Sequence, residues 1–202
     1  MDVEEFLKNY ATGDRDFRGI NLNNAKLNGA DLSGIILNDA ELNNASLNGA
    51  KLSGAMLNGA KFSDASLNGV DLSNATLNGT NFRQANLSGA YFSGVSLERV
   101  NLENAYLTGV HLFECRIDDS NLADANLRGA YLLQVLVTNT DLSGADFSGS
   151  KLEDVSMENV NLSNACLIGA EGIVIGGIIS LRLERINFKN ATMPDGTIFS
   201  SC

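Results

Sequence analysis

Few residues of this chain have the types and spacing that catalysis requires. His111 is the single histidine among 202 residues, and no serine or cysteine lies at a spacing typical of a nucleophilic triad. Asp118 and Asp119 form an acidic doublet, which is more often a solvated surface than an acid–base pair. Neither a disulfide framework nor metal-ligand spacing links the three cysteines, Cys115, Cys166 and Cys202. We therefore expect no catalytic residue, no metal site and no cofactor.

A group of aromatic and apolar residues at normally polar positions is the stronger functional signal. Tyr91, His111 and Tyr131 are evenly spaced, and Phe113 and Leu133 each come two positions after one of them. We call these five residues the aromatic patch. Aromatic residues beside charged ones are enriched at protein interfaces, although stacking between neighbouring strands would also stabilise the structure itself. Both interpretations of the patch stay open at this point.

Charge and hydropathy limit the partners. The formal net charge is −10 and the isoelectric point is about 4.5, which argues against direct contact with nucleic-acid phosphates. The start of the sequence has no hydrophobic signal segment, and the apolar segment 171–180 is far too short to span a bilayer. We expect a cytoplasmic protein with an unidentified protein partner, no direct nucleic-acid binding and no membrane contact, as a monomer or a weak dimer.

A strict five-residue period must position these side chains. From Phe17 to Leu167 every fifth residue is Leu, Phe, Ile, Val or Met, which gives 31 consecutive positions. Two positions before most of them lies Ala or another small residue. This period matches neither the turn of an α-helix nor the alternation of a flat strand. Repetition of this kind predicts a solenoid.

A second, fourfold longer period divides the repeats among four sides. At every fourth repeat, Ala occupies all eight positions from Ala25 to Ala165, and Gly occupies all eight from Gly29 to Gly169. The pattern predicts a square coil of four pentapeptides, with successive coils stacked at about strand spacing, ~4.8 Å. The glycines are expected at a corner where the backbone either adopts φ > 0 or passes too close to a neighbour for a Cβ.

The repeats resemble those of the pentapeptide repeat family. The stretches that carry the resemblance include ADLSG at 30–34, ADANLRGAYL at 123–132 and TDLSGADFSG at 140–149. The resemblance implies an all-β solenoid, namely a right-handed quadrilateral β-helix, and the handedness comes from the resemblance alone. The opening and closing segments look like those of small, single-domain cyanobacterial members.

The expected fold and the family resemblance together indicate which classes of function to expect. A rod filled by Leu offers no cleft that excludes water, so we expect a non-enzymatic scaffold or regulator that presents flat faces to a protein partner. Some family members resemble a DNA duplex in size and charge, and one alternative is therefore a DNA mimic acting on a type II topoisomerase. The acidic residues here are diluted by Asn and Ser. A structural protein without a specific partner is the other alternative.

The two ends are predicted to differ from the repeats. Residues 1–14 are expected to form a short N-terminal capping α-helix, since Asp2 and Glu5 fit a capping box and one helical face is apolar, with Val3, Phe6, Leu7 and Tyr10. Residues 15–170 form the β-helix. Within 171–202 the register breaks at 171–180, a predicted bulge or loop on the last coils or, alternatively, an exposed dimer contact. The repeats then resume one residue out of phase, with an interior column predicted at Leu183, Phe188, Met193 and Ile198.

Overall fold

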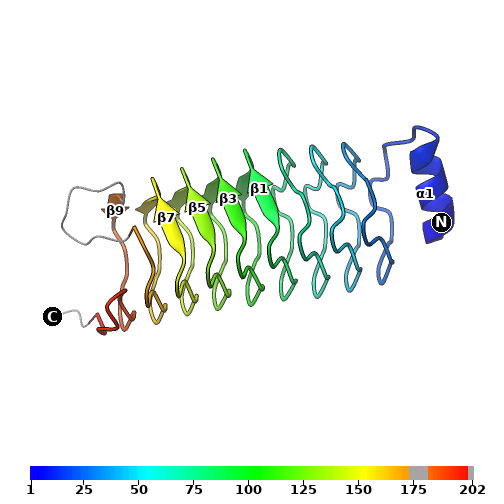
Figure 1. Cartoon of the computed structure of the whole chain (residues 1–202). Coiled ribbons are helices and arrows are strands. Elements are labelled where there is room, and N and C mark those ends of the chain that lie inside the picture. The colour runs from blue at the N-terminus through cyan, green and yellow to red at the C-terminus, as the bar shows by residue number, and fades with distance from the viewer. Residues whose placement is uncertain (173–181, 200–202) are drawn as a thin grey trace.

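The chain forms a long rod with a helix at one end (Figure 1). The computed structural model describes residues 1–172 and 182–199. Its one helix, α1, spans Val3–Ala11, and nine three-residue strands follow within these described residues: β1 (Tyr91–Ser93), β2 (Ser96–Glu98), β3 (His111–Phe113), β4 (Arg116–Asp118), β5 (Tyr131–Leu133), β6 (Leu136–Thr138), β7 (Lys151–Glu153), β8 (Ser156–Glu158) and β9 (Arg182–Glu184).

Pairing between equivalent residues of successive coils builds the rod. Parallel bridges such as Asp16↔Ile36 and Asn21↔Glu41 begin the stack. Further along, β1-β3-β5-β7 and β2-β4-β6-β8-β9 form two parallel sheets, each on one side of the rod. We name these sides the β1 face and the β2 face. The other two sides are joined by isolated bridges, so the chain is a four-sided parallel β-helix.

The interior is the predicted column of large apolar residues. All 31 positions from Phe17 to Leu167 are buried, and so are all eight alanines of the column from Ala25 to Ala165. Where two phenylalanines follow each other, as at Phe62 and Phe82, the rings stack with centroids 5.1 Å apart. Burial of each such side chain stabilises the fold by about 1.5–3 kcal/mol, so the core explains why every fifth residue is apolar.

The glycine column marks a left-handed corner. Its eight residues from Gly29 to Gly169 have φ between +62° and +67°. A Cβ added at Gly89 would meet no atom within 4 Å, so the alternative of backbone crowding is wrong for this position. Corners on other sides adopt the same conformation mostly with Asn or Asp, such as Asn24 at φ +61° and Asp39 at φ +58°, because these side chains tolerate it best after glycine.

Helix α1 covers the first coil. The Asp2 side chain accepts a hydrogen bond from the Glu5 amide (2.8 Å) and caps the helix. Phe6 is completely buried, and its ring meets that of Phe17 edge-on with centroids 4.8 Å apart. The Tyr10 hydroxyl donates to the Ser33 carbonyl oxygen (2.8 Å). Leu7, which the sequence places on the same apolar face, is exposed.

The register shifts near the C-terminal end. Bridges such as Asn161↔Asn187 and Cys166↔Thr192 join residues that are further apart in the sequence than those of earlier coils. The segment predicted as a bulge or loop, 171–180, lies outside the described residues except for its first two. At the second of these, Gly172, φ is +88° and an added Cβ would collide with the Leu152 carbonyl oxygen. The Leu152 carbonyl group occupies the space that a side chain at residue 172 would need, which explains why a glycine stands where the five-residue period places a core residue.

The interior column predicted after the shift is only partly right. In β9, Leu183 lies in register with the core residue Met157. Met193 is buried, and Phe188 packs partly buried against the core. Ile198 is wrong, since it is 67% exposed.

The chain reverses direction after Met193, which explains this error. Thr192 and Ile198 form an antiparallel bridge, and the Phe199 amide donates to the Ala191 carbonyl oxygen (2.8 Å). Successive residues of a strand point to opposite sides, so Phe199 turns inward in place of Ile198. Its ring centroid lies 5.4 Å from that of Phe188.

Candidate protein-interaction face

The three rings of the aromatic patch form a straight stack on the β1 face. Tyr91, His111 and Tyr131 are the first residues of β1, β3 and β5, and each pairs in register with the next. The ring centroids are 4.7 Å apart for Tyr91 and His111 and 5.1 Å apart for His111 and Tyr131, with interplanar angles of 3° and 5°. Parallel pairing without a register change therefore converts the longer sequence period into one continuous column.

All five residues of the aromatic patch lie together and outside the core. Tyr91 is 48% exposed, Tyr131 43% and Leu133 37%. His111 and Phe113 are half-buried, and their ring centroids lie 5.6 Å apart at a tilt of 55°. The five side chains thus share one face of the rod, outside the core column.

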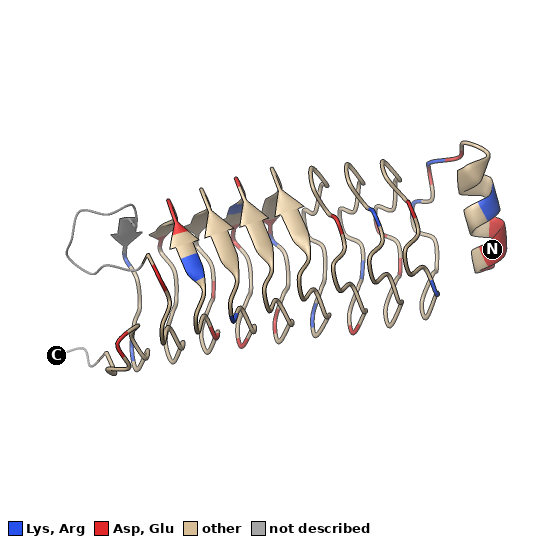
Figure 2. Ribbon diagram, viewed as in Figure 1, with Lys and Arg blue, Asp and Glu red and all other residues tan. Residues whose placement is uncertain are grey.

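Charged residues continue the aromatic column in both directions. Beyond Tyr131, the Lys151 ammonium lies 5.9 Å from the ring centre and 4.0 Å from the Glu171 carboxylate. Beyond Tyr91, the column continues through Asp71 to Lys51. Figure 2 shows this boundary, because β1, β3 and β5 have no charged residue whereas β7 has Lys and Glu at its two ends. The face is thus apolar in the middle and charged at both ends.

Two shallow hollows flank the stack. One, of about 120 Å³, is lined by Phe113, Tyr131, Leu132, Leu133, Lys151 and Glu153. The other, of about 410 Å³, lies beyond Tyr91, where the column changes from a large ring to Asp71, with Lys51 and Ser73 beside it. Both are open depressions on a flat surface, and they suit side chains of a macromolecule better than an enclosed small molecule.

The sequence analysis missed Leu136. This first residue of β6 is 36% exposed and lies just around the corner from Leu133. The sequence could have identified this residue, because the equivalent residues on neighbouring coils are polar: Ser96, Arg116 and Ser156. Leu136 adds an exposed apolar residue on the β2 face.

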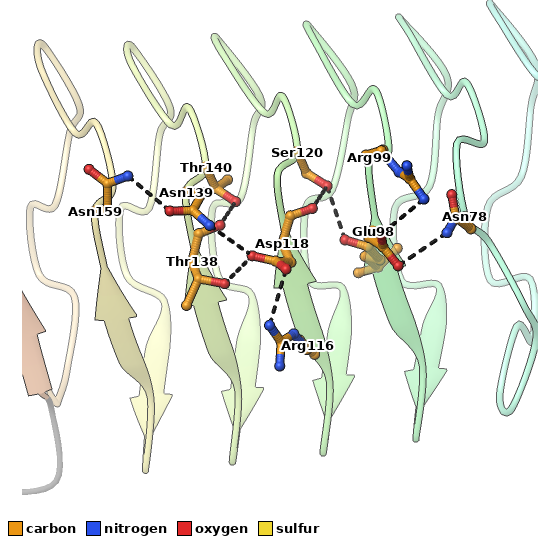
Figure 3. A network of polar contacts seen from close by, with 11 residues as sticks. Asn78, Glu98, Arg99, Arg116, Asp118, Ser120, Thr138, Asn139, Thr140 and Asn159 are labelled. Atoms are coloured by element: carbon orange, nitrogen blue, oxygen red, sulfur yellow. Dashed lines mark hydrogen bonds and ion pairs between the residues drawn. The ribbon is translucent and has the colours of Figure 1, made fainter.

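Asp118 of the acidic doublet belongs to a polar network on the β2 face (Figure 3). Asp118 accepts hydrogen bonds from the Thr138 hydroxyl, from the Arg116 guanidinium (3.1 Å) and from the Asn139 amide (3.3 Å). These contacts, with the Thr138 bond first, lower the pKa of the Asp118 carboxyl below its ordinary value. Asp119 occupies a left-handed corner at φ +49°. The doublet therefore links coils and turns a corner.

The cysteines occupy unrelated environments. Cys115 is buried in an alanine position, and its burial raises the pKa of the thiol. Cys166 is half-buried beside the Ser148 hydroxyl (3.2 Å), and Cys202 lies outside the described residues.

Within 1–172 and 182–199 there is no group of three or more His, Cys, Asp or Glu residues that could hold a metal ion. In the same residues, no helix has the length and apolarity needed to cross a membrane.

Fold and surface together define a parallel β-solenoid with one aromatic face. Residues 16–171 match the profile of pentapeptide repeats in eight copies, and the chain belongs to this family. Its structure is similar to that of HetL, a pentapeptide repeat protein involved in heterocyst differentiation regulation from the cyanobacterium Nostoc sp. strain PCC 7120. The two are 30% identical over 98% of this chain and 100% of HetL, with a TM-score of 0.63. The fold is therefore the quadrilateral β-helix that the repeat pattern predicts, with the right-handedness that the family resemblance implies.

A second similar structure is that of QnrB1, a plasmid-mediated fluoroquinolone resistance protein. It is 18% identical over 84% of this chain and 90% of QnrB1, with a TM-score of 0.67. At that identity the likeness concerns the fold alone. The comparison with curated protein sequences gives no match.

Proposed function

We propose that this protein is a non-enzymatic scaffold or regulator that binds a protein partner through the aromatic patch. The observation that carries the proposal is the group formed by the three stacked rings, Phe113 and Leu133, of which Tyr91, Tyr131 and Leu133 are exposed, whereas Met56, Tyr106 and Ile168 are exposed on other sides of the rod. Exposed apolar side chains that adjoin one another mark interaction sites more often than scattered single ones do.

Stacking alone does not account for this surface. It explains why Tyr91, His111 and Tyr131 follow one another, since stacked rings stabilise adjacent strands. Leu133 and Leu136 belong to no such stack, and the core column behind them is already filled by Leu132 and Val137. Tyr beside aliphatic residues and a charged rim is the composition of protein interfaces. The regulatory role named for HetL is consistent with a binding protein.

The DNA-mimic alternative receives less support from the surface charges. Carboxylates are interleaved with cations, as in the ion pairs Lys61–Glu41 (3.3 Å) and Arg128–Asp146 (3.2 Å). A duplex mimic needs an unbroken negative potential along its length. The likeness to QnrB1 adds only the shared fold.

A pull-down from the source cell tests the proposal. The double variant Tyr131→Ser/Leu133→Ser should lose partners that the unchanged chain captures, at a cost of a few kcal/mol of binding energy if either residue is a hot spot. Tyr106→Ser is the matched control, because Tyr106 is an exposed tyrosine on another side of the rod. Circular dichroism should show all three proteins folded. Equal capture by the double variant and the control would reject the patch as the binding site.

A further inference from the structure

We propose that the aromatic patch binds a second copy of this chain, packed antiparallel on the β1 face with His111 at the twofold axis. The inference rests on the proposed function, because it names the partner of the same surface. It follows from the order of charges along the column that contains the three stacked rings.

The column is antisymmetric in charge about His111. One coil away on either side stand Tyr91 and Tyr131, which are alike. Two coils away stand Asp71 on one side and Lys151 on the other, which are opposite in charge. Reversing the column thus places each residue against its complement.

The residues three coils from His111 follow the same rule, and on the Lys51 side the column continues one coil further to Asp31. Three coils from His111 the column has Lys51 on one side and Glu171 on the other. A twofold axis in the plane of the face and perpendicular to the rod would set Asp71 against the partner's Lys151 and Lys51 against the partner's Glu171. Symmetry repeats both contacts, so four ion pairs would enclose the stacked rings of the two copies.

The parallel arrangement uses fewer of these charges. A twofold axis along the rod would set this column against the neighbouring one, which contains Ser53, Ser73 and Glu153. Lys151 would then meet the partner's Glu153, but Asp71 and Lys51 would face serines. Electrostatic complementarity therefore selects the antiparallel arrangement.

The shape of the face permits this contact. The coils stack along a straight rod (Figure 1), and the three rings lie nearly parallel at interplanar angles of 3° and 5°, so two copies can stay aligned along the column. At the axis Phe113 would meet the partner's Phe113, and Leu133 would meet the partner's Ser93. The result is an apolar centre with a charged rim, as in other protein interfaces.

The dimer should be weak. The column from Lys51 to Glu171 spans seven coils, which gives a strip on the order of 30 Å long and one strand wide. Such a strip is smaller than a standard specific interface and corresponds to a weak, transient contact, so we expect a Kd on the order of 100 µM at low salt. The existing contacts of the rim lysines compete little, since Lys51–Asp31 (3.4 Å) and Lys151–Glu171 (4.0 Å) join exposed groups.

Sedimentation equilibrium of the full chain and its charge variants tests the inference. Asp71→Lys and Lys151→Asp should each raise the dimer Kd at least about tenfold, because each places like charges together twice per dimer. The double variant Asp71→Lys/Lys151→Asp restores opposite charges across the axis, and its Kd should return to within about threefold of the unchanged chain. Circular dichroism checks that each variant is folded.

Asp141→Lys is the matched control on another side of the rod. Asp71 and Asp141 occupy the same repeat position, and each accepts a hydrogen bond from the amide two positions later, Ser73 or Ser143, at 2.9 Å. The control should leave the Kd unchanged.

Three outcomes would overturn the inference: a monomer at all concentrations up to about 1 mM, an equal effect of Asp141→Lys, or no recovery in the double charge variant. The proposed function is judged separately. A chain that stays monomeric while Tyr131→Ser/Leu133→Ser still abolishes capture of another protein would assign the face to that protein. If Tyr131→Ser/Leu133→Ser still dimerises and still captures the other protein, both the proposed dimer and the proposed function are rejected.

Discussion

At the residue scale, the left-handed corners are the positions where residue type is most restricted. Gly89 has φ +66° with open space around it, so the cost of a side chain there is conformational and not steric crowding. Gly89→Val should destabilise the fold by about 1–2 kcal/mol, which lowers the melting temperature by roughly 2–8 °C in a chain of this size. Ser88→Val, one position earlier and outside the left-handed region, is the control. Equal melting temperatures of the two variants would contradict this account.

The residues of the aromatic patch could be predicted because their types depart from their columns. Tyr131 and Leu133 stand where the repeats elsewhere have Ser, Asp or Lys, and the longer period places them on one side. Leu136 carries the same signal but follows a corner, so a search limited to one side passes over it. Side-chain contacts such as the Thr138–Asp118 bond depend on rotamers, which repeat spacing does not determine.

At the element scale, α1 protects the open edge of the first coil. Removal of residues 1–13 would uncover Phe17 and the unpaired strand edge beside it, since Phe6 covers that ring. The shortened chain should keep its β-sheet circular dichroism but associate end to end. Light scattering after size exclusion measures this, in the Asp71→Lys background so that contacts through the β1 face do not interfere. A shortened chain that stays monomeric at high concentration would show that α1 is not a cap.

The C-terminal segment shows where repeat spacing stops being informative. The phase shift after Glu171 is visible in the sequence, and Met193 is buried as the shifted phase predicts. Ile198 also fits that phase, yet it is exposed. The reversal around Pro194 and Gly196 changes the pairing from parallel to antiparallel, and a strand that runs back alternates with period two rather than five. The five-residue spacing alone therefore does not predict the residue at which the repeats end.

At the scale of the whole molecule, the period determines the fold far more than it determines the function. Each pentapeptide supplies one core residue such as Leu32 and one corner such as Gly34, and stacking does the rest. The order of charges around His111 is also present in the sequence. It indicates an antiparallel contact only once Asp71 and Lys151 are known to lie in one column. The identity of a heterologous partner is not contained in either period.

The same logic predicts how the rod tolerates loss of length. Deleting residues 41–60 removes one complete coil and joins Ala40 to Lys61, so every later column keeps its side and its neighbours. We expect a folded, slightly less stable protein, because a solenoid loses one set of nearest-neighbour contacts per coil. The deletion of 41–62 is only slightly longer, but it leaves a coil too short to close the square and takes away the core residue Phe62. That variant should lose cooperative unfolding in thermal circular dichroism. Similar transitions for the two deletions would show that stability does not depend on complete coils.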